Sequence, residues 1–404
     1  MQLKKRKIVS DVLLNFISAL LPIIILQFIV YPIVARNTSN DEYGLMITIY
    51  SLLCMVAFSL GNVTNNIRLI TQNKYEQSKF QGDFNVLLIV FSVVDIAIIS
   101  FGTIFYEGAM DFVSIIMIVV SSILLLLDEY LEVYFRINLN FRKVLYNRFS
   151  LTIGYIVGTT LFIITKHWEF IYIGGQLASF LFLATNTPLL KEPLKTTAFF
   201  KETLKDCSAL IGASLLSNAM NYADKLLLYP LIGGVGVAIY YAASLLGKMI
   251  SMAISPVTSV VLSYISQYDS IKNHAVLKLL KYGVLICGVG YIATLIVTKP
   301  ILIFLYPDWV NEAMEIVPVI TLATIISAMC GLLNPFVLKF CKTSWQIVIN
   351  TMSTIIYIVA ALALISPFGL IGFCWGTVMG CASKLIIMLL VYFYVNRENT
   401  DEQI

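Results

Sequence analysis

The chain has 404 residues, of which 59% are hydrophobic and only 12% charged, and its formal net charge is +4. Soluble domains are about 25% charged, and a soluble fold of this length has too little interior to bury so much apolar surface. The composition excludes an ordinary soluble domain and predicts an integral membrane protein, and the small net charge does not suggest a nucleic-acid partner. The first residues, MQLKKRK, lead directly into an apolar helix without a small-residue cleavage site, so we expect no signal peptide.

Twelve apolar stretches, joined by short loops, are long enough to cross a bilayer. A membrane-spanning helix needs about 20 predominantly apolar residues. The sequence therefore predicts an all-α integral membrane fold with about twelve transmembrane helices. The predicted spans cover residues 11–35, 43–62, 84–106, 112–135, 147–166, 169–190, 207–230, 235–262, 276–304, 315–338, 345–366 and 369–394.

The basic residues are distributed unequally between the two sides of these spans. If the N-terminus is cytoplasmic, the inside segments carry most of the 27 basic residues, whereas the outside loops carry only Arg36, Lys166 and Lys299. Lys and Arg concentrate in cytoplasmic loops. We therefore expect both termini to be cytoplasmic.

The two halves of the chain resemble each other weakly. The segment IVYPIVA at 29–35 is similar to LLYPLIG at 227–233, and each ends the long span that opens its half. This match favours two six-helix lobes, residues 1–190 and 207–404. The segment between them, KEPLKTTAFFKETLKD at 191–206, is basic and amphipathic. It predicts a cytoplasmic linker with an interfacial helix.

Three predicted spans of the second half carry a lysine on an otherwise small and polar face. Positions three, four and seven residues apart share one face of a helix, and a polar face within a membrane turns toward other helices or water. Lys248 and Lys384 lie too far from their helix ends to reach the interface easily, which favours an aqueous cavity. For Lys225, the alternative interpretation is that its side chain extends to the outer membrane interface. For the asparagines, the alternative is that they only form hydrogen bonds between helices. The faces comprise Ser214, Asn218, Asn221 and Lys225 with Asp224 at the edge; Ser244, Lys248, Ser251 and Ser255; and Thr377, Cys381 and Lys384.

Acidic groups dominate the first half instead. Asp95 lies in the middle of the third span, and Asp128, Glu129 and Glu132 lie in the inner half of the fourth. Glu132 precedes Arg136 by four residues, the order that favours an ion pair on one helix. A local structural network at the inner rim is the alternative interpretation of these groups.

The sequence lacks the residues that several classes of enzyme and metal site require. The chain has only two histidines and no P-loop, which disfavours histidine-based transfer and ATP hydrolysis. Its seven cysteines form no CxxC pair and fall in spans or inner loops, so neither a disulfide framework nor a metal site is indicated. We expect a transporter that is not an enzyme and needs no cofactor.

The segment from 215 to 269 then resembles a known family. Asp224-Lys225, Gly233, the Tyr240-Tyr241 pair and Ser255-Pro256 are similar to the start of the second half of Wzx-type polysaccharide flippases, in the multidrug/oligosaccharidyl-lipid/polysaccharide (MOP) export superfamily. Pro32 followed by Glu42-Tyr43-Gly44, and YFRINLNFRK at 134–143, resemble other parts of that pattern. Ile239 replaces the small residue that usually precedes the tyrosine.

The resemblance implies two six-helix lobes around a central cavity that opens alternately to each side. It implies flipping of an undecaprenyl-pyrophosphate-linked oligosaccharide across the bacterial plasma membrane for O-antigen, capsule or exopolysaccharide synthesis, with a polysaccharide polymerase as a further candidate partner. On this interpretation the buried lysines bind the pyrophosphate, and the amides and hydroxyls bind sugar. The expected substrate-binding residues are Lys225, Lys248, Lys384, Asn218, Asn221 and Ser251.

The same resemblance leaves the energy source and the cargo open. Candidate groups for coupling to H⁺ or Na⁺, or for gating, are Asp95, Asp128, Glu132, Arg136 and Asp224. A lipid II-type flippase, an ion-coupled drug exporter of the same fold and a non-transporting scaffold of a polysaccharide-synthesis complex are the alternatives. A cationic-drug exporter would favour carboxylates without the compensating lysines.

Overall fold

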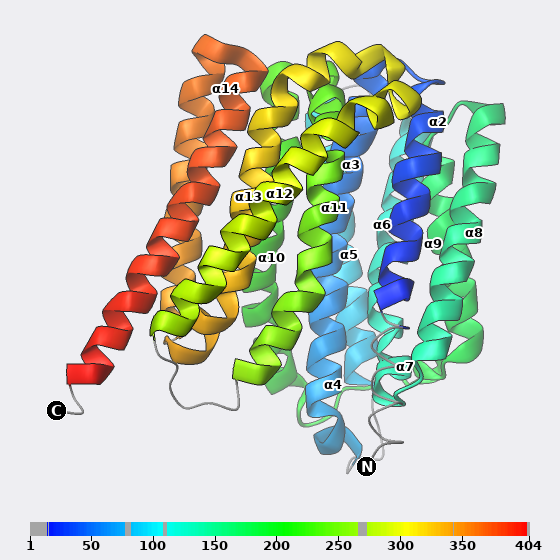
Figure 1. Cartoon of the computed structure of the whole chain (residues 1–404). Helices are drawn as coiled ribbons and strands as arrows, with labels where there is room; N and C mark the ends of the chain where they lie inside the picture. The colour runs from blue at the N-terminus through cyan, green and yellow to red at the C-terminus, as the bar shows by residue number, and fades with distance from the viewer. Residues whose placement is uncertain are drawn as a thin grey trace. The chain divides into compact units, whose positions relative to one another are not determined.

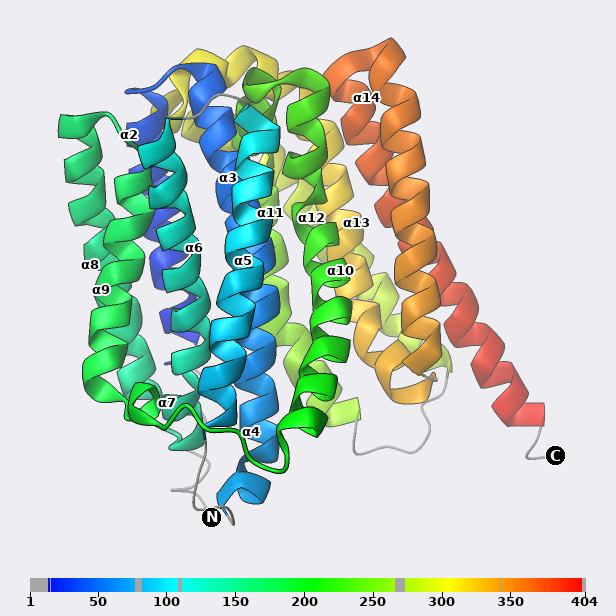
Figure 2. The same cartoon turned by 180° about the vertical axis from the view of Figure 1, so that it is seen from behind.

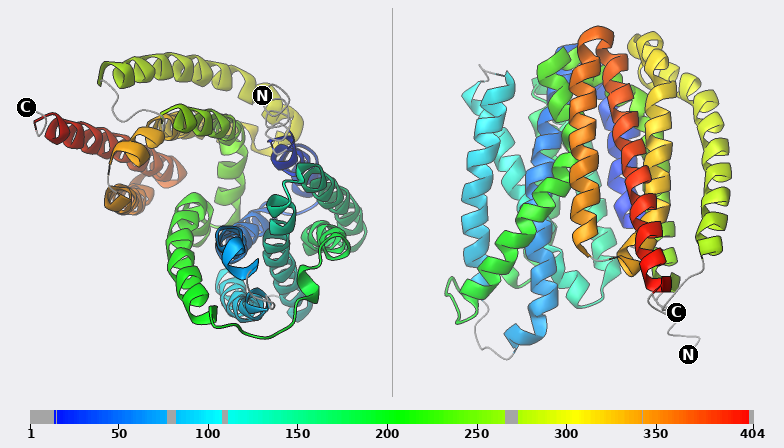
Figure 3. Two further views of the ribbon diagram at one scale, coloured as in Figure 1. Left: turned by 90° about the horizontal axis from the view of Figure 1, so that it is seen from below. Right: turned by 90° about the vertical axis from the view of Figure 1, so that its left-hand side faces the viewer.

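The computed structural model describes Leu14 and residues 16–76, 82–107, 111–265, 273–341 and 343–401, and this part of the chain is helical without any strand (Figure 1). Side chains at positions 73, 76, 107, 220, 250–279, 343–344 and 396–401 lie outside the description. The chain divides into two compact units, Met1–Val237 and Ala238–Ile404. Figures 2 and 3 show the helices of each unit from other sides.

The first unit is a bundle of long helices, two of which contain π-helical turns. The opening helix runs through the π-helix η1 into α2, and α3 continues through a second π-helix, η2, into α4. The elements are η1 (Leu26–Val30), α2 (Tyr31–Ala35), α3 (Asn40–Ala57), η2 (Phe58–Asn62), α4 (Val63–Glu76), α5 (Asp83–Glu107), α6 (Phe112–Leu131), α7 (Val133–Ile137), α8 (Phe141–Thr165), α9 (Glu169–Asn186), the 3₁₀ turn η3 (Leu189–Lys191) and α10 (Phe200–Ile232).

Local sequence signals set several of these helix ends. The Ser39 side chain accepts a hydrogen bond from the Glu42 amide at the start of α3, and Asn140 accepts one from the Lys143 amide at the start of α8. Such caps satisfy amides that have no partner within the helix. Lys166 ends α8 in the left-handed conformation at φ 66°. Lys166 thereby begins the short turn from α8 into α9, and these two helices pack against each other.

The second unit contains α11 from Ala238 onward, followed by α12, η4, α13 and α14. Gly369, at φ 57°, divides α14 into two arms. Gly372 packs against Leu364 and Gly376 against Ala361, so the arms run antiparallel with backbones in close contact. The elements are α11 (Gly234–Ile265), α12 (Asn273–Leu305), the 3₁₀ turn η4 (Pro307–Trp309), α13 (Val310–Phe340) and α14 (Thr343–Asp401).

The predicted all-α membrane architecture is confirmed. Within the described residues, eight helical stretches are long and apolar enough to cross a membrane, and the longest, Trp345–Val395, contains both arms of α14. Each of the twelve predicted spans falls mainly on a helix. α9, α10 and α11 are absent from the eight. α10 has low mean hydropathy because of its asparagines and charged residues, and α11 contributes a shorter apolar stretch, Gly234–Met249.

The predicted linker does not form a separate interfacial helix. The backbone is irregular between η3 and Phe200, and the residues from Phe200 onward are the first turns of α10. Pro193 lacks the amide that a helix would need there. We call residues 189–203 the linker strap. By contacts α10 belongs to the first unit, so lobes at 1–190 and 207–404 remain a prediction about the internal repeat.

The linker strap is fixed to α4 and to the N-terminal end of α5 by polar contacts. Glu192 forms an ion pair with Arg68 of α4 at 2.5 Å, and Asn85 donates to the backbone oxygens of Leu189 and Glu192. Arg68 also donates to the hydroxyl of Tyr130. The strap therefore caps one end of the bundle.

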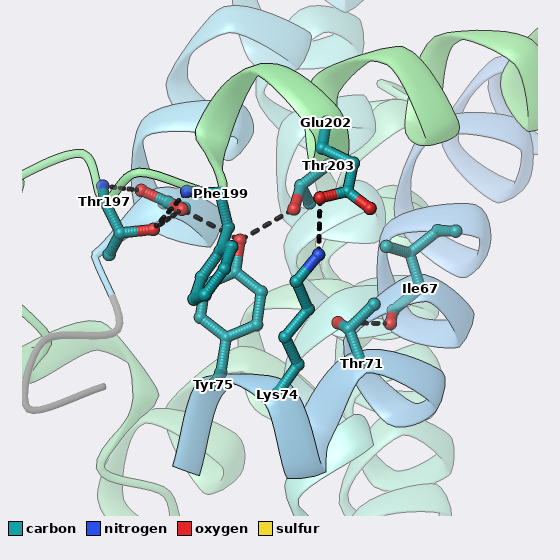
Figure 4. A network of polar contacts seen from close by, with 9 residues as sticks. Ile67, Thr71, Lys74, Tyr75, Thr197, Phe199, Glu202 and Thr203 are labelled. Atoms are coloured by element: carbon teal, nitrogen blue, oxygen red, sulfur yellow. Dashed lines mark hydrogen bonds and ion pairs between the residues drawn. The ribbon is translucent and has the colours of Figure 1, made fainter. Parts of the chain in front are cut away.

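A second set of contacts holds the C-terminal part of the strap (Figure 4). The carboxylate of Asp83 accepts from the amide and hydroxyl of Thr197 and from the hydroxyl of Tyr75. The Tyr75 hydroxyl also bonds with that of Thr203, and Lys74 pairs with Glu202. These bonds satisfy the polar groups of an irregular segment, which would otherwise be costly to bury.

Candidate functional site

A cavity of about 460 Å³ lies inside the first unit. Small-molecule sites commonly have about 300–1,000 Å³. The lining residues lie between Ser18 and Asn218 in the sequence. The wall contains both apolar and polar side chains, with amides, hydroxyls and three charged groups among the apolar ones. A polar cavity between membrane-spanning helices is a site for a polar ligand, because polar groups facing lipid are costly.

The charged part of the wall comes from α6, the turn residue that follows it, and α8. Arg148 Nη2 lies 2.8 Å from Glu132 Oε2 and 3.7 Å from Glu129 Oε1. The three side chains are 13–23% exposed, so they reach the cavity without being open to bulk solvent. Pairing is what permits such charges at this depth. Two carboxylates share one guanidinium.

The predicted pairing of Glu132 with Arg136 is wrong. α6 ends at Leu131, and Glu132 is the turn residue before α7, so the helix is interrupted between the two side chains. Glu132 turns to α8 and pairs with Arg148. Arg136 instead donates to Asn65 Oδ1 at 2.7 Å and to Asn66 Oδ1 at 3.1 Å.

Asparagines of η2 and α4 form the next part of the wall. Asn66 donates to Asn62 Oδ1 at 3.1 Å, and both line the cavity. Asn65 donates to the backbone oxygen of Glu129 at 2.7 Å and so joins α4 to α6. Gly61 allows this approach, because a Cβ there would lie 2.6 Å from the Leu126 oxygen. The asparagines thus serve both packing and the cavity.

Both π-helical turns border the cavity. Leu26 of η1, and Phe58 and Asn62 of η2, belong to its wall. A π-turn adds a residue to the helix, which rotates the following side chains and is frequent at functional sites. In the α3–η2–α4 helix, this rotation brings Asn62 and Asn66 to the face on which Tyr50 also lies.

α10 closes the cavity with Ser214 and Asn218. Asn218 donates to Ser59 Oγ at 2.9 Å and to Ser214 Oγ at 3.3 Å, which ties α10 to η2. Lys225, two turns further, is 6% exposed, and its ammonium lies 3.0 Å from Asp224 Oδ1. Asn221 is exposed and does not line this cavity. Of the predicted face of α10, the structure brings Ser214 and Asn218 to the cavity.

The other predicted lysines belong to the second unit. Lys248 Nζ of α11 lies 5.7 Å from the ring centre of Tyr240, which is about two turns earlier in the same helix. Lys384 of α14 is partly buried, near Cys330 and Cys381. The side chain of Ser251 lies outside the described residues. The role of Lys248 and Lys384 in phosphate binding stays a prediction.

Two buried aspartates lie outside the cavity wall. Asp95 of α5 is fully buried and accepts a hydrogen bond from Ser122 Oγ at 2.9 Å, while its other oxygen has no partner among the described residues. Asp128 is 4% exposed, with Ser179 and Arg148 close by, but neither oxygen accepts a hydrogen bond of normal geometry in the described part. A carboxylate so placed favours a proton or a cation.

Sequence reasoning missed Arg148 as the counter-charge of this site. Arg148 lies at the start of the fifth predicted span, so its charge was assigned to the cytoplasmic side together with the other basic residues of the inside segments. Gln176 and Tyr155, which are hydrogen-bonded at 3.2 Å, were also missed. A search of helix faces in the fifth and sixth spans could have found them, since Arg148, Leu151 and Tyr155 are spaced three and four residues apart.

Comparisons with known proteins identify the fold. No protein-family model and no curated protein matches the sequence. The lipid II flippase MurJ, in an inward closed conformation, is structurally similar with a TM-score of 0.71 and 15% sequence identity, over 96% of this chain and 87% of that chain. A point mutant of the Vibrio cholerae MATE transporter VcmN matches with a TM-score of 0.64 and 14% identity, over 97% of each chain.

A multidrug resistance MATE family transporter of the MOP superfamily, in an inward-facing conformation, also matches. Its TM-score is 0.64 at 12% identity, over 96% of this chain and 98% of that chain. The chain therefore has the fold of MOP-superfamily transporters. The identities are too low to carry more than the fold.

Proposed function

We propose that the protein is a flippase that moves an undecaprenyl-pyrophosphate-linked oligosaccharide from the inner to the outer leaflet of the bacterial plasma membrane by alternating access. The product would serve O-antigen, capsule or exopolysaccharide synthesis. The observation that carries the proposal is the cavity of the first unit, which places amides, hydroxyls and paired charges between membrane-spanning helices. Such a wall suits a sugar rather than an apolar lipid tail.

The fold supports transport, and the membrane-embedded lysines support a phosphorylated cargo. Lys225 is buried beside Asp224, and Lys248 and Lys384 lie in helices of the second unit. Ammonium groups replace the water that a pyrophosphate loses in the membrane. Asn218 and the serines of the same faces, Ser251 included, would then contact the sugar.

The buried acids are the proposed coupling groups. Asp95 and Asp128 have carboxylate oxygens without hydrogen-bond partners in the described part of the chain. Binding of H⁺ or Na⁺ to such a group would stabilise one conformation over another and so couple a gradient to transport. Glu132, Arg136 and Asp224 are candidates for gating, because each belongs to a polar contact between or along helices.

A second candidate function is export of a cationic drug. The cavity wall contains two carboxylates and one guanidinium, which favours a cation. A lipid II-type flippase is a further candidate on fold alone. These functions are separated by their cargo, since a drug exporter moves a cationic dye and a flippase moves the lipid-linked oligosaccharide.

The test is a translocation assay in proteoliposomes that contain a fluorescent polyprenyl-pyrophosphate oligosaccharide. We expect the wild-type protein to expose the lipid to a membrane-impermeant reagent faster than protein-free vesicles do. The triple variant Lys225→Gln, Lys248→Gln, Lys384→Gln should lose this activity. Normal flipping by the triple variant would remove the phosphate-binding assignment, and a scaffold role would leave translocation absent in both proteins.

A further inference from the structure

The cavity of the first unit has a charge that does not suit a phosphate. Among the described residues, the charged groups in its wall are Glu129, Glu132 and Arg148, which give a formal charge of −1 when both acids are ionised. A further negative charge in the cavity is repelled by this net charge, because like charges a few ångströms apart interact strongly where water is scarce. A pyrophosphate is therefore disfavoured in this cavity, whatever the lysines do elsewhere.

The same wall is well suited to hydroxyl groups. Gln176 donates to Tyr155, and Asn218 donates to Ser59 and Ser214, so the amide nitrogens are engaged. Their amide oxygens have no partner within the described part of the chain and can accept from a ligand. The two carboxylates are also acceptors, and hydrogen bonds to ionised acceptors are the stronger ones.

Apolar side chains complete the wall on the other faces. Leu125 of α6, and Val144 and Leu151 of α8, lie beside the charged cluster. A sugar ring presents hydroxyls at its edge and C–H groups on its faces, which matches acceptors next to aliphatic side chains. A sugar that bears an ammonium group adds an ion pair with Glu129 or Glu132, whereas a uronic acid adds repulsion.

From this geometry we infer that the cavity is a sugar subsite that accepts an uncharged or amine-bearing sugar and rejects a sugar that carries a carboxylate. The inference rests on the proposed function, and it separates the cargo into two parts. The phosphates bind outside this cavity, and the sugar enters it. Selectivity among cargoes is then set by Glu129 and Glu132 together with Arg148.

The test uses the full-length protein in detergent micelles and three synthetic polyprenyl-pyrophosphate lipids. They differ only in the attached sugar, which is N-acetylglucosamine, glucosamine or glucuronic acid. Affinity is measured by native mass spectrometry as the concentration for half-saturation. We expect the glucuronic acid lipid to bind at least about tenfold more weakly than the other two, because its carboxylate is repelled by the negative charge of the cavity wall.

The double variant Glu129→Gln, Glu132→Gln makes the wall positive and should abolish or reverse this preference. Glu312→Gln, an exposed position of α13, is the control and should leave it unchanged. Equal affinities of the wild-type protein for the three lipids would overturn the inference, and this comparison needs no variant to fold. Absence of binding by all three lipids would instead count against the proposed function, because the shared pyrophosphate and polyprenyl groups would then not be recognised.

Discussion

Two ion pairs of the linker strap have the same length but different surroundings, and they should differ in strength. Arg68–Glu192 and Lys74–Glu202 are both 2.5 Å long. The first pair is 6% and 17% exposed, the second 35% and 63%. Arg68 also packs 5.0 Å from the ring centre of Phe84. Removing Glu192 therefore leaves a buried guanidinium without its carboxylate partner.

The expected magnitudes follow from burial. Breaking a buried pair by removing one partner costs about 3–5 kcal/mol, so we expect Glu192→Ala to lower the free energy of unfolding by about 3 kcal/mol. Exposed pairs contribute about 0–1 kcal/mol, so Glu202→Ala should cost about 0.5 kcal/mol. Added salt should reduce the smaller effect but leave most of the larger one.

The assay is reversible unfolding of the purified protein in mixed micelles, with increasing denaturing detergent and helicity as the readout. Glu202→Ala is the matched control, since it removes the same side chain from the same strap. Equal losses from the two variants would refute the reasoning that burial decides the strength of these pairs. A larger loss from Glu202→Ala would refute it more strongly.

Three further predictions concern the first unit. Arg148→Gln leaves two carboxylates facing each other and should cost about 2–4 kcal/mol in the same unfolding assay, and adding Glu132→Gln should restore part of this loss. Gly44→Ala places a Cβ against the backbone of Gly234 and should cost about 1–3 kcal/mol, whereas Gly212→Ala meets no atom within 4 Å and should be nearly neutral. Burial raises the pKa of Tyr75, and the neighbouring Asp83 raises it further. The neutral phenol therefore stabilises the fold below a pH of about 10, and this stabilisation should be lost as the pH rises further. Unfolding measured from pH 8 to 11 should show this pH dependence in the wild-type protein and not in Tyr75→Phe.

The helical membrane architecture could be predicted because it depends on apolar length. A stretch of about 20 apolar residues has few stable alternatives in a bilayer, so the predicted spans fall on helices even where α14 contains two of them. The weak internal repeat could not predict which helices pack together in one compact unit. α10 opens the second half of the sequence, yet Asn218 joins it to η2 of the first unit.

The site was predicted less well, because it depends on exact helix rotation. The spacing of Glu132 and Arg136 indicated one continuous helix, but the turn at Glu132 directs that side chain to Arg148. The π-turn η2 likewise rotates Asn62 and Asn66, and hydrophobic periodicity does not mark such a turn. Periodicity found Ser214 and Asn218, which belong to a regular helix, whereas Asn221 of the same predicted face is exposed and does not line this cavity.

Translocation of a lipid-linked oligosaccharide by the purified protein is the most direct test of the central claim. The measurement follows how fast a fluorescent polyprenyl-pyrophosphate oligosaccharide becomes accessible from the far side of sealed proteoliposomes. We predict a rate that rises with the amount of wild-type protein and falls to the protein-free rate in the triple lysine variant. A wild-type rate equal to that of protein-free vesicles, in preparations that do export a cationic dye, would contradict the account.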